Sequence, residues 1–312
     1  MRSAIAPFAL CLFALSLLPA PMALACEGRL IEDDRIHASP LCVPADPQRV
    51  VVLDQSFALG IGMDMGLPII GAPLTRMSDE ALLARAEAAG VTDIGFVTEP
   101  SLERIVALQP DLILGFTGDP GLAEAYYPML SSLASTLLEI SGDWRGFYDT
   151  VAALTGQQEK AAQMFAEYEA RLEQIRARVP DTPVSVVRIT SWDFQVYTDT
   201  PGAYAPFEIL SEAGVQRTEY ETAPDGPALK RPDWEELSQL DGDILLYIVG
   251  GTNDSATSGR HEEVIGNPLW QMLPAVATGN VHRIDPAVWM EFSGLGSAHR
   301  VLDDIEAYII PE

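Results

Sequence analysis

The 312-residue chain has few basic residues: 19 Lys and Arg stand against 45 Asp and Glu, which gives a formal net charge of −26. A protein this acidic repels nucleic acid and anionic lipid surfaces, so we expect no nucleic-acid partner. The simplest explanation is that the excess acidic residues are spread over exposed helices and keep the protein soluble. Charge by itself therefore says little about a ligand.

Long apolar runs are also scarce. The run Ile5–Leu18 follows Arg2 and precedes Ala23-Leu24-Ala25, the pattern of a secretory signal with a small-residue cleavage site. It is shorter than the roughly 20 apolar residues that a membrane-spanning helix needs, and no later stretch approaches that length. We expect residues 1–25 to be removed, so that the exported chain begins at Cys26.

Cysteine is rare, with three residues in the chain. Loss of the signal removes Cys11 and leaves Cys26 and Cys42. Two cysteines in an exported protein most simply form one disulfide, here within an N-terminal segment of residues 26–45. The alternative is lipidation of Cys26, but a lipoprotein site usually has Leu three positions earlier, where this chain has Ala23. We favour the Cys26–Cys42 disulfide.

The chain lacks the usual motifs of catalysis, metal binding and cofactor binding. Its four histidines show no paired spacing and have no cysteine neighbours: His37, His261, His282 and His299. Ser293 lacks the preceding glycine of a nucleophile elbow. The glycines of Gly60–Gly66 come seven residues or more after Leu53, too late for a dinucleotide loop, and we interpret them as a helix ending. We expect no metal site and no enzyme, with a periplasmic hydrolase as a remote alternative.

A repeated helix-to-strand pattern is the most informative feature that is present. The stretches Ser101–Gly115 (SLERIVALQPDLILG) and Asp233–Tyr247 (DWEELSQLDGDILLY) share a glutamate, two aliphatic positions and an aspartate at the same spacing, followed by three aliphatic residues. The copies lie on either side of one long helical segment. A repeat at this distance is typical of a duplicated domain and predicts two similar α/β lobes.

Apolar runs alternate with helical patterns through both halves of the chain. Strands are predicted at Arg49–Leu53, Pro68–Gly71, Leu112–Leu114, Thr136–Ile140, Val184–Ile189, Gln195–Thr198, Ile244–Val249 and Val281–Ile284. Between the halves, Gln157–Val179 forms one amphipathic helix of about 35 Å, ended by prolines. The predicted fold is α/β, with two Rossmann-like lobes of parallel sheets (46–155 and 180–312) joined by a connecting helix (156–179).

Ligands of parallel α/β lobes bind beyond the carboxyl ends of the strands. The aromatic and basic residues predicted there are Phe57, Arg76, Phe116, Arg188, Trp192, Tyr247 and Trp289. Aromatic faces with a few arginines suit a planar, partly anionic ligand, although any one aromatic residue could instead pack the edge of a lobe. Arg188 ends an apolar strand, where an unpaired charge is costly, so its partner is either a ligand or a carboxylate.

Glu103 and Glu235 occupy the same position in the two copies of the repeat. Ser101 and Asp233 are placed to cap the two helices, which puts each glutamate in a first turn, where the helix dipole favours a carboxylate. Alternatively, the two acids are exposed anchors, one per lobe, for a basic two-fold partner. The residues alone favour neither explanation.

The stretches Thr98–Ile105 and Leu108–Ile113 resemble the first-lobe signature of periplasmic substrate-binding proteins of ABC importers, in the helical-backbone branch that serves ferric siderophores, haem and cobalamin. Four later stretches resemble the second-lobe pattern: Asn267–Trp270, Leu273–Val276, Val281–Asp285 and Val301–Ile305. The resemblance extends from about Arg49 to Ile309.

The resemblance implies a periplasmic monomer that holds a ferric siderophore between its lobes and delivers it to an inner-membrane ABC permease dimer. It implies permease contacts through Glu103 and Glu235, and no cofactor beyond the iron carried within the chelate. The strand Val184–Arg188 is similar to one common among siderophore binders; haem and cobalamin are the alternative ligands. Some hydroxamate binders have an arginine where this chain has Val97, so anchoring of the chelate falls to Arg76 or Arg188.

Overall fold

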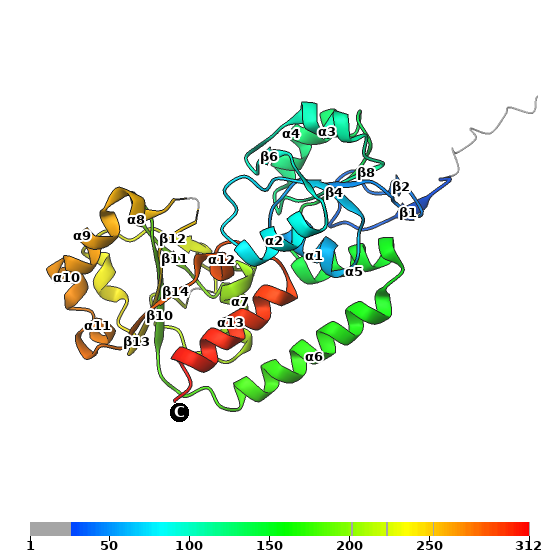
Figure 1. The fold of residues 1–312 in the computed structure, drawn as a ribbon. Helices are drawn as coiled ribbons and strands as arrows, with labels where there is room; N and C mark the ends of the chain where they lie inside the picture. Colours follow the sequence, from blue (N-terminus) through cyan, green and yellow to red (C-terminus); the bar gives the residue numbers. More distant parts are fainter. Residues whose placement is uncertain (1–25, 201, 223, 252, 312) are drawn as a thin grey trace, which may run out of the picture.

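The alternating strands and helices form two lobes, each built on a five-stranded sheet (Figure 1). The computed structural model describes residues 26–200, 202–222, 224–251 and 253–311, so the predicted signal of residues 1–25 lies outside the described residues. The predicted α/β class is confirmed. Within the described ranges, no helix is both long enough and apolar enough to cross a membrane.

The N-terminal lobe has an entirely parallel sheet in the order β5-β4-β3-β8-β9. Its central strand β3 (Val50–Val52) is fully buried, as expected for a strand covered by helices on both faces. The other strands are β4 (Ile69–Ala72), β5 (Thr92–Asp93), β8 (Leu112–Phe116) and β9 (Ser135–Glu139), and the helices are α1 (Phe57–Asp64), α2 (Glu80–Ala88), α3 (Leu102–Leu108), α4 (Pro120–Leu130) and α5 (Trp144–Thr155). A two-stranded ribbon of β6 (Gly95–Phe96) and β7 (Glu99–Pro100) precedes α3.

The C-terminal lobe has a mixed sheet in the order β12-β11-β10-β13-β14. Strands β10 (Val184–Ile189), β13 (Ile244–Ile248) and β14 (Val281–Ile284) are parallel. Strands β11 (Phe194–Tyr197) and β12 (Leu229–Lys230) are antiparallel to their neighbours, so the prediction of a purely parallel sheet is wrong for them. The turn between β10 and β11 is too short for a parallel crossover, which requires a dozen or more residues.

The helical elements of this lobe are mostly short. They are α7 (Ala205–Glu212), the 3₁₀ turn η1 (Glu236–Gln239), α8 (Ser255–Ser258), α9 (Arg260–Gly266), α10 (Pro268–Gln271), α11 (Pro274–Thr278), α12 (Pro286–Trp289) and α13 (Leu295–Tyr308). The second copy of the sequence repeat therefore runs into β13 through a 3₁₀ turn, whereas the first runs into β8 through the α-helix α3.

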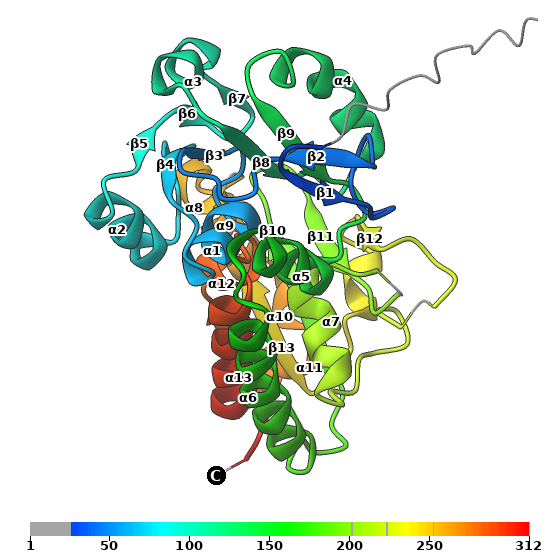
Figure 2. The same ribbon diagram turned by 90° about the vertical axis from the view of Figure 1, so that its right-hand side faces the viewer.

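The long helix α6 (Gln158–Arg176) passes from one lobe to the other beneath both sheets (Figure 1). It is slightly shorter than the predicted helix and spans about 28 Å. It lies beside α13 (Figure 2), where Arg171 forms ion pairs with Asp303 and Glu306. Near its start α6 contacts the N-terminal lobe, where Lys160 donates to the Asp64 carbonyl, so the helix is anchored on both lobes.

A second connection between the lobes is formed by the segment Glu291–Leu295, which we call the interlobe contact. Glu291 of the C-terminal lobe accepts hydrogen bonds from the backbone N–H groups of Ser78 (2.8 Å) and Asp79 (3.3 Å) before α2. The Tyr148 hydroxyl on α5 accepts a hydrogen bond from the Leu295 N–H (3.0 Å). The lobes are therefore held together by a helix and by these contacts.

Gly60 explains how the interlobe contact fits against α1. A Cβ atom at Gly60 would lie 2.2 Å from the Ser293 carbonyl oxygen, so only glycine permits this approach. The glycines of Gly60–Gly66 thus lie in α1 and at its end, as predicted, and serve packing.

The N-terminal segment is an antiparallel hairpin of β1 (Arg29–Ile31) and β2 (Leu41–Val43). Cys26 and Cys42 form the predicted disulfide. The hairpin loop joins the edge of the N-terminal sheet, where the His37 N–H donates to the Leu138 carbonyl (2.9 Å). The disulfide therefore holds Cys26 against a hairpin that is itself joined to the first lobe.

Candidate functional site

The predicted aromatic residues Phe57 and Phe116 meet at the carboxyl edge of the N-terminal sheet. Their rings are stacked, with centroids 4.2 Å apart. Phe57 also contacts two aromatic rings of the other lobe, Tyr204 (6.3 Å) and Phe292 (5.6 Å). The Phe57–Phe116 pair therefore lies at the boundary between the lobes, where a ligand of both lobes would sit.

A groove of about 1000 Å³ opens beside this aromatic pair. Its size is at the upper end of the range typical of small-molecule sites. It is lined by Leu53, Asp54, Phe96, Val97, Thr98, Glu99, Pro100, Ser101, Leu102, Gly115, Phe116, Thr117, Leu122, Tyr126, Met129, Leu130 and Leu138. Most of these side chains are apolar, so the N-terminal side of the site suits the hydrocarbon or aromatic part of a ligand.

Sequence reasoning missed the contribution of α4 to this groove. Leu122, Tyr126 and Met129 recur at spacing i, i+4 and i+7, and all three are exposed large apolar side chains. That spacing is the signal of one apolar helix face and could have been found in the sequence. What the spacing could not show is that this face lines a groove instead of packing into the core.

Asp54 is one of the ionisable groups that line the groove. Its carboxylate accepts hydrogen bonds from the backbone N–H groups of Ala58 (2.8 Å) and Phe116 (3.1 Å). Burial nevertheless raises the pKa of Asp54 to about 6, and the charge of Glu139 adds to the rise. Burial likewise raises the pKa of Glu139. Both carboxyl groups therefore take up a proton at a higher pH than an exposed carboxyl group does.

Arg188 lies at the carboxyl end of β10 with 7% of its surface exposed. Its hydrogen bonds to the Gln195 side chain and the Gly250 carbonyl are long, 3.5 Å each, and its Nε has no partner among the described residues. No carboxylate in the described ranges forms an ion pair with it. Burying a cation with so few hydrogen-bond and charge partners costs free energy. The sequence had left two possible partners for Arg188, a ligand or a carboxylate, and of these the ligand remains.

Tyr204 extends the aromatic pair into the C-terminal lobe. Its buried hydroxyl accepts a hydrogen bond from the Phe292 N–H (3.1 Å), and burial raises the pKa of this phenol, so it remains protonated. Tyr204, Phe57, Phe116 and Phe292 therefore meet at the interlobe boundary. Arg188 lies at the carboxyl end of β10 in the C-terminal lobe.

Arg76 and Trp192 lie further out, one on each lobe. Arg76 follows β4 in the left-handed backbone region (φ 60°), and its guanidinium lies 5.6 Å from the centre of the Phe96 ring, which lines the groove. Trp192 lies in the turn after β10 and is 62% exposed. Both residues are exposed.

Two of the predicted contacts are not accessible in this way. Trp289 is fully buried in α12, and its indole N–H donates to Asp304 (2.7 Å), which contradicts its predicted role as a ligand contact. Tyr247 lies on the opposite face of the sheet from Arg188, because side chains alternate along β13 and its ring packs on Trp270 and His261. We remove both residues from the candidate site.

The two repeat glutamates lie outside the groove lining and are exposed. Ser101 accepts a hydrogen bond from the Arg104 N–H (3.3 Å), and Asp233 accepts from the N–H groups of Glu235 (2.8 Å) and Glu236 (2.9 Å), so both predicted caps are present. Neither the Glu103 nor the Glu235 carboxylate accepts a hydrogen bond from the part of the chain that the structure describes. The capping is done by Ser101 and Asp233, so the carboxylates of Glu103 and Glu235 are available to bind another molecule.

Two α/β lobes, one long connecting helix and a groove at the carboxyl edge of the N-terminal sheet are the features of a two-lobed solute-binding protein. Residues 73–288 match the model of the family described as "Periplasmic binding protein", and the chain belongs to that family. The family resemblance found in the sequence is thereby confirmed. Members of this family are binding proteins.

Curated relatives match over most of their length. The chain is 28% identical over 282 residues to the probable siderophore-binding lipoprotein YfiY of Bacillus subtilis (strain 168), covering 86% of this chain and 84% of that protein. It is 27% identical over 272 residues to the achromobactin-binding periplasmic protein of Dickeya dadantii (strain 3937), covering 83% and 85%. The similarity therefore includes both lobes.

A solved structure shares the fold. The crystal structure of Staphylococcus aureus SirA complexed with staphyloferrin B superposes with a TM-score of 0.72 at 20% identity, covering 85% of this chain and 94% of that one. At this identity the similarity shows the architecture alone. It confirms the two-lobed arrangement.

Proposed function

We propose that this protein captures a ferric siderophore between its lobes in the periplasm and delivers it to an ABC permease dimer of the inner membrane. Arg188 is the observation that carries the proposal: it is a buried cation at the carboxyl end of β10, without a carboxylate partner in the described ranges. An anionic iron chelate supplies both the missing charge partner and planar groups for the aromatic rings.

The ligand-binding residues that we propose are Arg188, Arg76, Phe57, Phe116 and Trp192. Iron enters as part of the chelate, and no side chain of the protein need bind it. In the described part of the chain no three His, Cys, Asp or Glu side chains are grouped so that they could hold a metal ion. The protein acts as a monomer and performs no catalysis in this proposal.

The names of the relatives support iron chelates as the ligand class. One is described as a probable siderophore-binding lipoprotein and another as an achromobactin-binding periplasmic protein. Both names fit a periplasmic carrier that serves a transporter.

A thermal-shift screen of the purified chain tests the proposal. Its arms are ferric complexes of citrate-type, hydroxamate and catecholate chelators, together with haem and cobalamin. We expect one class of ferric chelate to raise the melting temperature in proportion to the logarithm of its concentration, because a ligand that binds only the native state stabilises it by mass action. Stabilisation by haem or cobalamin alone would contradict the siderophore assignment, and no stabilisation by any of them would contradict the function.

A further inference from the structure

Gln195 is a buried amide directly beside Arg188, the cation on which the proposed ligand site depends. The two residues are paired across the ladder of β10 and β11, so their side chains lie on the same face of the sheet. The Gln195 Oε1 accepts from the Arg188 Nη1 (3.5 Å) and from the Tyr197 hydroxyl (3.4 Å). Gln195 is therefore a neutral partner, which accepts from the guanidinium without cancelling its charge.

The other end of the Gln195 amide is held by Asp193. The Gln195 Nε2 donates to the Asp193 Oδ1 (3.4 Å). The two neighbours fix the direction of the amide, because the opposite direction would place its NH₂ group against a guanidinium and its oxygen against a carboxylate. The amide oxygen therefore faces Arg188, and the amide nitrogen faces Asp193.

Arg231, the residue after β12, holds Asp193 in its turn. Its Nη1 forms an ion pair with the Asp193 Oδ2, while the other carboxylate oxygen accepts from Thr190 and Gln195. The Arg231 side chain is 53% exposed, so this ion pair contributes little to the free energy of unfolding. What the ion pair does is fix the position of the Asp193 carboxylate.

Asp193 also orders the turn that carries Trp192. The Thr190 hydroxyl, which donates to Asp193, accepts from the backbone N–H groups of Trp192 (3.3 Å) and Asp193 (3.0 Å). The two residues that the C-terminal lobe contributes to the proposed ligand site, Arg188 and Trp192, are therefore both linked to one carboxylate.

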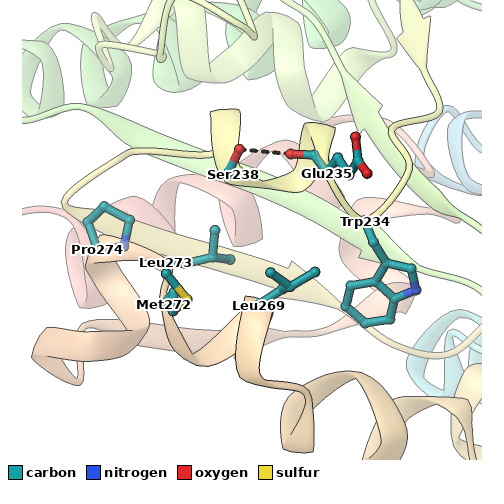
Figure 3. A pocket seen from close by; sticks show the side chains of 7 residues that line it. All are labelled: Trp234, Glu235, Ser238, Leu269, Met272, Leu273 and Pro274. Atoms are coloured by element: carbon teal, nitrogen blue, oxygen red, sulfur yellow. Dashed lines mark hydrogen bonds between the residues drawn. The ribbon is translucent and has the colours of Figure 1, made fainter.

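The segment after β12 also contacts β11 on the opposite face of the sheet. Phe194 alternates with Gln195 along β11, so its side chain points to the other face. There its ring packs edge to face on Trp234, with centroids 5.0 Å apart. Figure 3 shows Trp234 at one end of a row of side chains that line a depression between η1 and α10. Residues 231–234 therefore hold the start of β11 by an ion pair on one face and a ring contact on the other.

We propose that Gln195, Asp193 and Arg231 form a positioning chain for the cation of the ligand site. The chain orients the Arg188 guanidinium toward an anionic group of the ligand. A guanidinium has five N–H donors, and the described residues use one on Nη1 and one on Nη2 of Arg188. The remaining donors form the planar fork that pairs with a carboxylate or another bidentate anion.

This inference rests on the proposed function, because it concerns how the same cation binds the ferric chelate. A guanidinium that is already ordered loses less rotamer freedom when the chelate arrives, so the positioning chain raises affinity. A carboxylate at position 195 would order the guanidinium equally well, but it would also compete with the chelate for it. The amide of Gln195 avoids that competition.

Nitrogen-15 relaxation of the Arg188 Nε–H group tests the positioning chain without any ligand, and the resonance is assigned by its loss in Arg188→Lys. We expect a rigid group in the wild type and a mobile one in Arg231→Gln. Arg231→Lys keeps the charge and should restore most of the order. The matched control is Arg176→Gln, which removes an exposed arginine that pairs with Glu173 and should leave Arg188 rigid.

Calorimetric titration with two anionic chelates, ferric citrate and ferric enterobactin, tests the consequence for binding. For whichever chelate the wild type binds, we expect Gln195→Glu to weaken binding at least tenfold, because the new carboxylate neutralises Arg188. The melting temperature of the unliganded variant should not fall, because Arg188 gains a charge partner. In an Arg188→Ala background, Gln195→Glu should cause no further loss of affinity.

Three results would overturn the inference. An Arg188 Nε–H group that is as rigid in Arg231→Gln as in the wild type would show that the chain does not order the cation. Wild-type affinity of Gln195→Glu would show that Arg188 meets no anionic group. Equal losses of affinity with and without Arg188 would assign Gln195 to the stability of the strand instead.

Failure of the proposed function has a different signature. If the wild type binds no ferric chelate, the proposed function is wrong, and the relaxation measurement, which needs no chelate, then decides for or against the positioning chain.

Discussion

Arg188 is the residue on which we expect ligand affinity to depend most. Replacement by alanine should weaken binding of the ferric chelate by about 2–5 kcal/mol, or roughly 30-fold to a few thousandfold, because it removes one partner of a buried charged pair. Calorimetric titration of the variant measures the loss.

The matched control for Arg188 is Arg178→Ala. Arg178 also forms hydrogen-bonded contacts, but it lies on the outer surface, where it pairs with Glu306. It should bind the chelate as the wild type does. Equal affinity of Arg188→Ala and Arg178→Ala would remove Arg188 from the binding site.

Asp54 makes stability depend on pH. Its pKa in the folded protein, about 6, lies above its ordinary value of 3.8, so the native state takes up a proton that the unfolded chain does not bind until lower pH. The free energy of unfolding should therefore rise by about 1 kcal/mol through this residue between pH 7 and pH 5. Urea unfolding at the two pH values measures the change.

The variant Asp54→Asn should lack this gain, since the amide does not titrate. The exposed Asp181→Asn provides the comparison and should retain the wild-type pH dependence. If the unfolding free energy of Asp54→Asn changes between the two pH values as that of the wild type does, Asp54 does not have the raised pKa.

The sequence could predict part of the site at this scale. Phe57, Phe116 and Arg188 follow or end clear apolar runs, and the ends of parallel strands meet at one edge of a sheet. The position of Trp289 could not be predicted in the same way. Whether a residue after a strand faces the cleft or the core depends on how α12 packs, and local sequence does not carry that information.

At the scale of elements, α1 packs so closely on the interlobe contact that we expect one added methyl group to lower the free energy of unfolding. In Gly60→Ala the new Cβ would lie 2.2 Å from the Ser293 carbonyl, so the lobes must shift, at a cost of about 1–3 kcal/mol in unfolding free energy. Gly296→Ala in α13 meets no atom within 4 Å and should be neutral or stabilising. Equal urea midpoints for the two variants would show that the approach at Gly60 is not tight.

The longer elements were predictable because their apolar runs are regular. The predicted strands correspond to β3, β4, β8, β9, β10, β11, β13 and β14, and the long helix corresponds to α6. The two-residue strands β5, β6, β7 and β12 were not predicted, since pairs this short have no periodicity. The antiparallel placement of β11 depends on the turn after β10, which the run of apolar residues does not reveal.

At the scale of the whole molecule, we predict that loss of the two repeat glutamates stops transport of the ferric chelate and leaves its binding unchanged. Glu103→Ala combined with Glu235→Ala should reduce cellular uptake of the ferric chelate to background, because the permease loses both anionic contacts, while the thermal shift with the chelate is unchanged. The exposed pair Glu87→Ala and Glu219→Ala is the matched control. Normal uptake by the Glu103 and Glu235 variant would leave these residues with a local helix role alone.

Only part of the arrangement of the two lobes could be predicted from the sequence. Duplication and the long helix predict two lobes joined by one helix, and the structure has two five-stranded sheets with α6 between them in the chain. The interlobe contact was not predicted, because Glu291 and Ser78 are 213 residues apart and neither has a local pattern that signals the other. Such pairings follow from the packing of the whole chain.

The central claim is that one ligand is held by both lobes at the carboxyl edges of their sheets. Hydrogen–deuterium exchange of the protein, with and without the ferric chelate that binds best in the thermal-shift screen, tests it most directly. We predict slower exchange at residues 54–58 and 115–118 of the N-terminal lobe and at residues 189–195 and 250–251 of the C-terminal lobe. Protection confined to one lobe, or found only away from these segments, would contradict the claim.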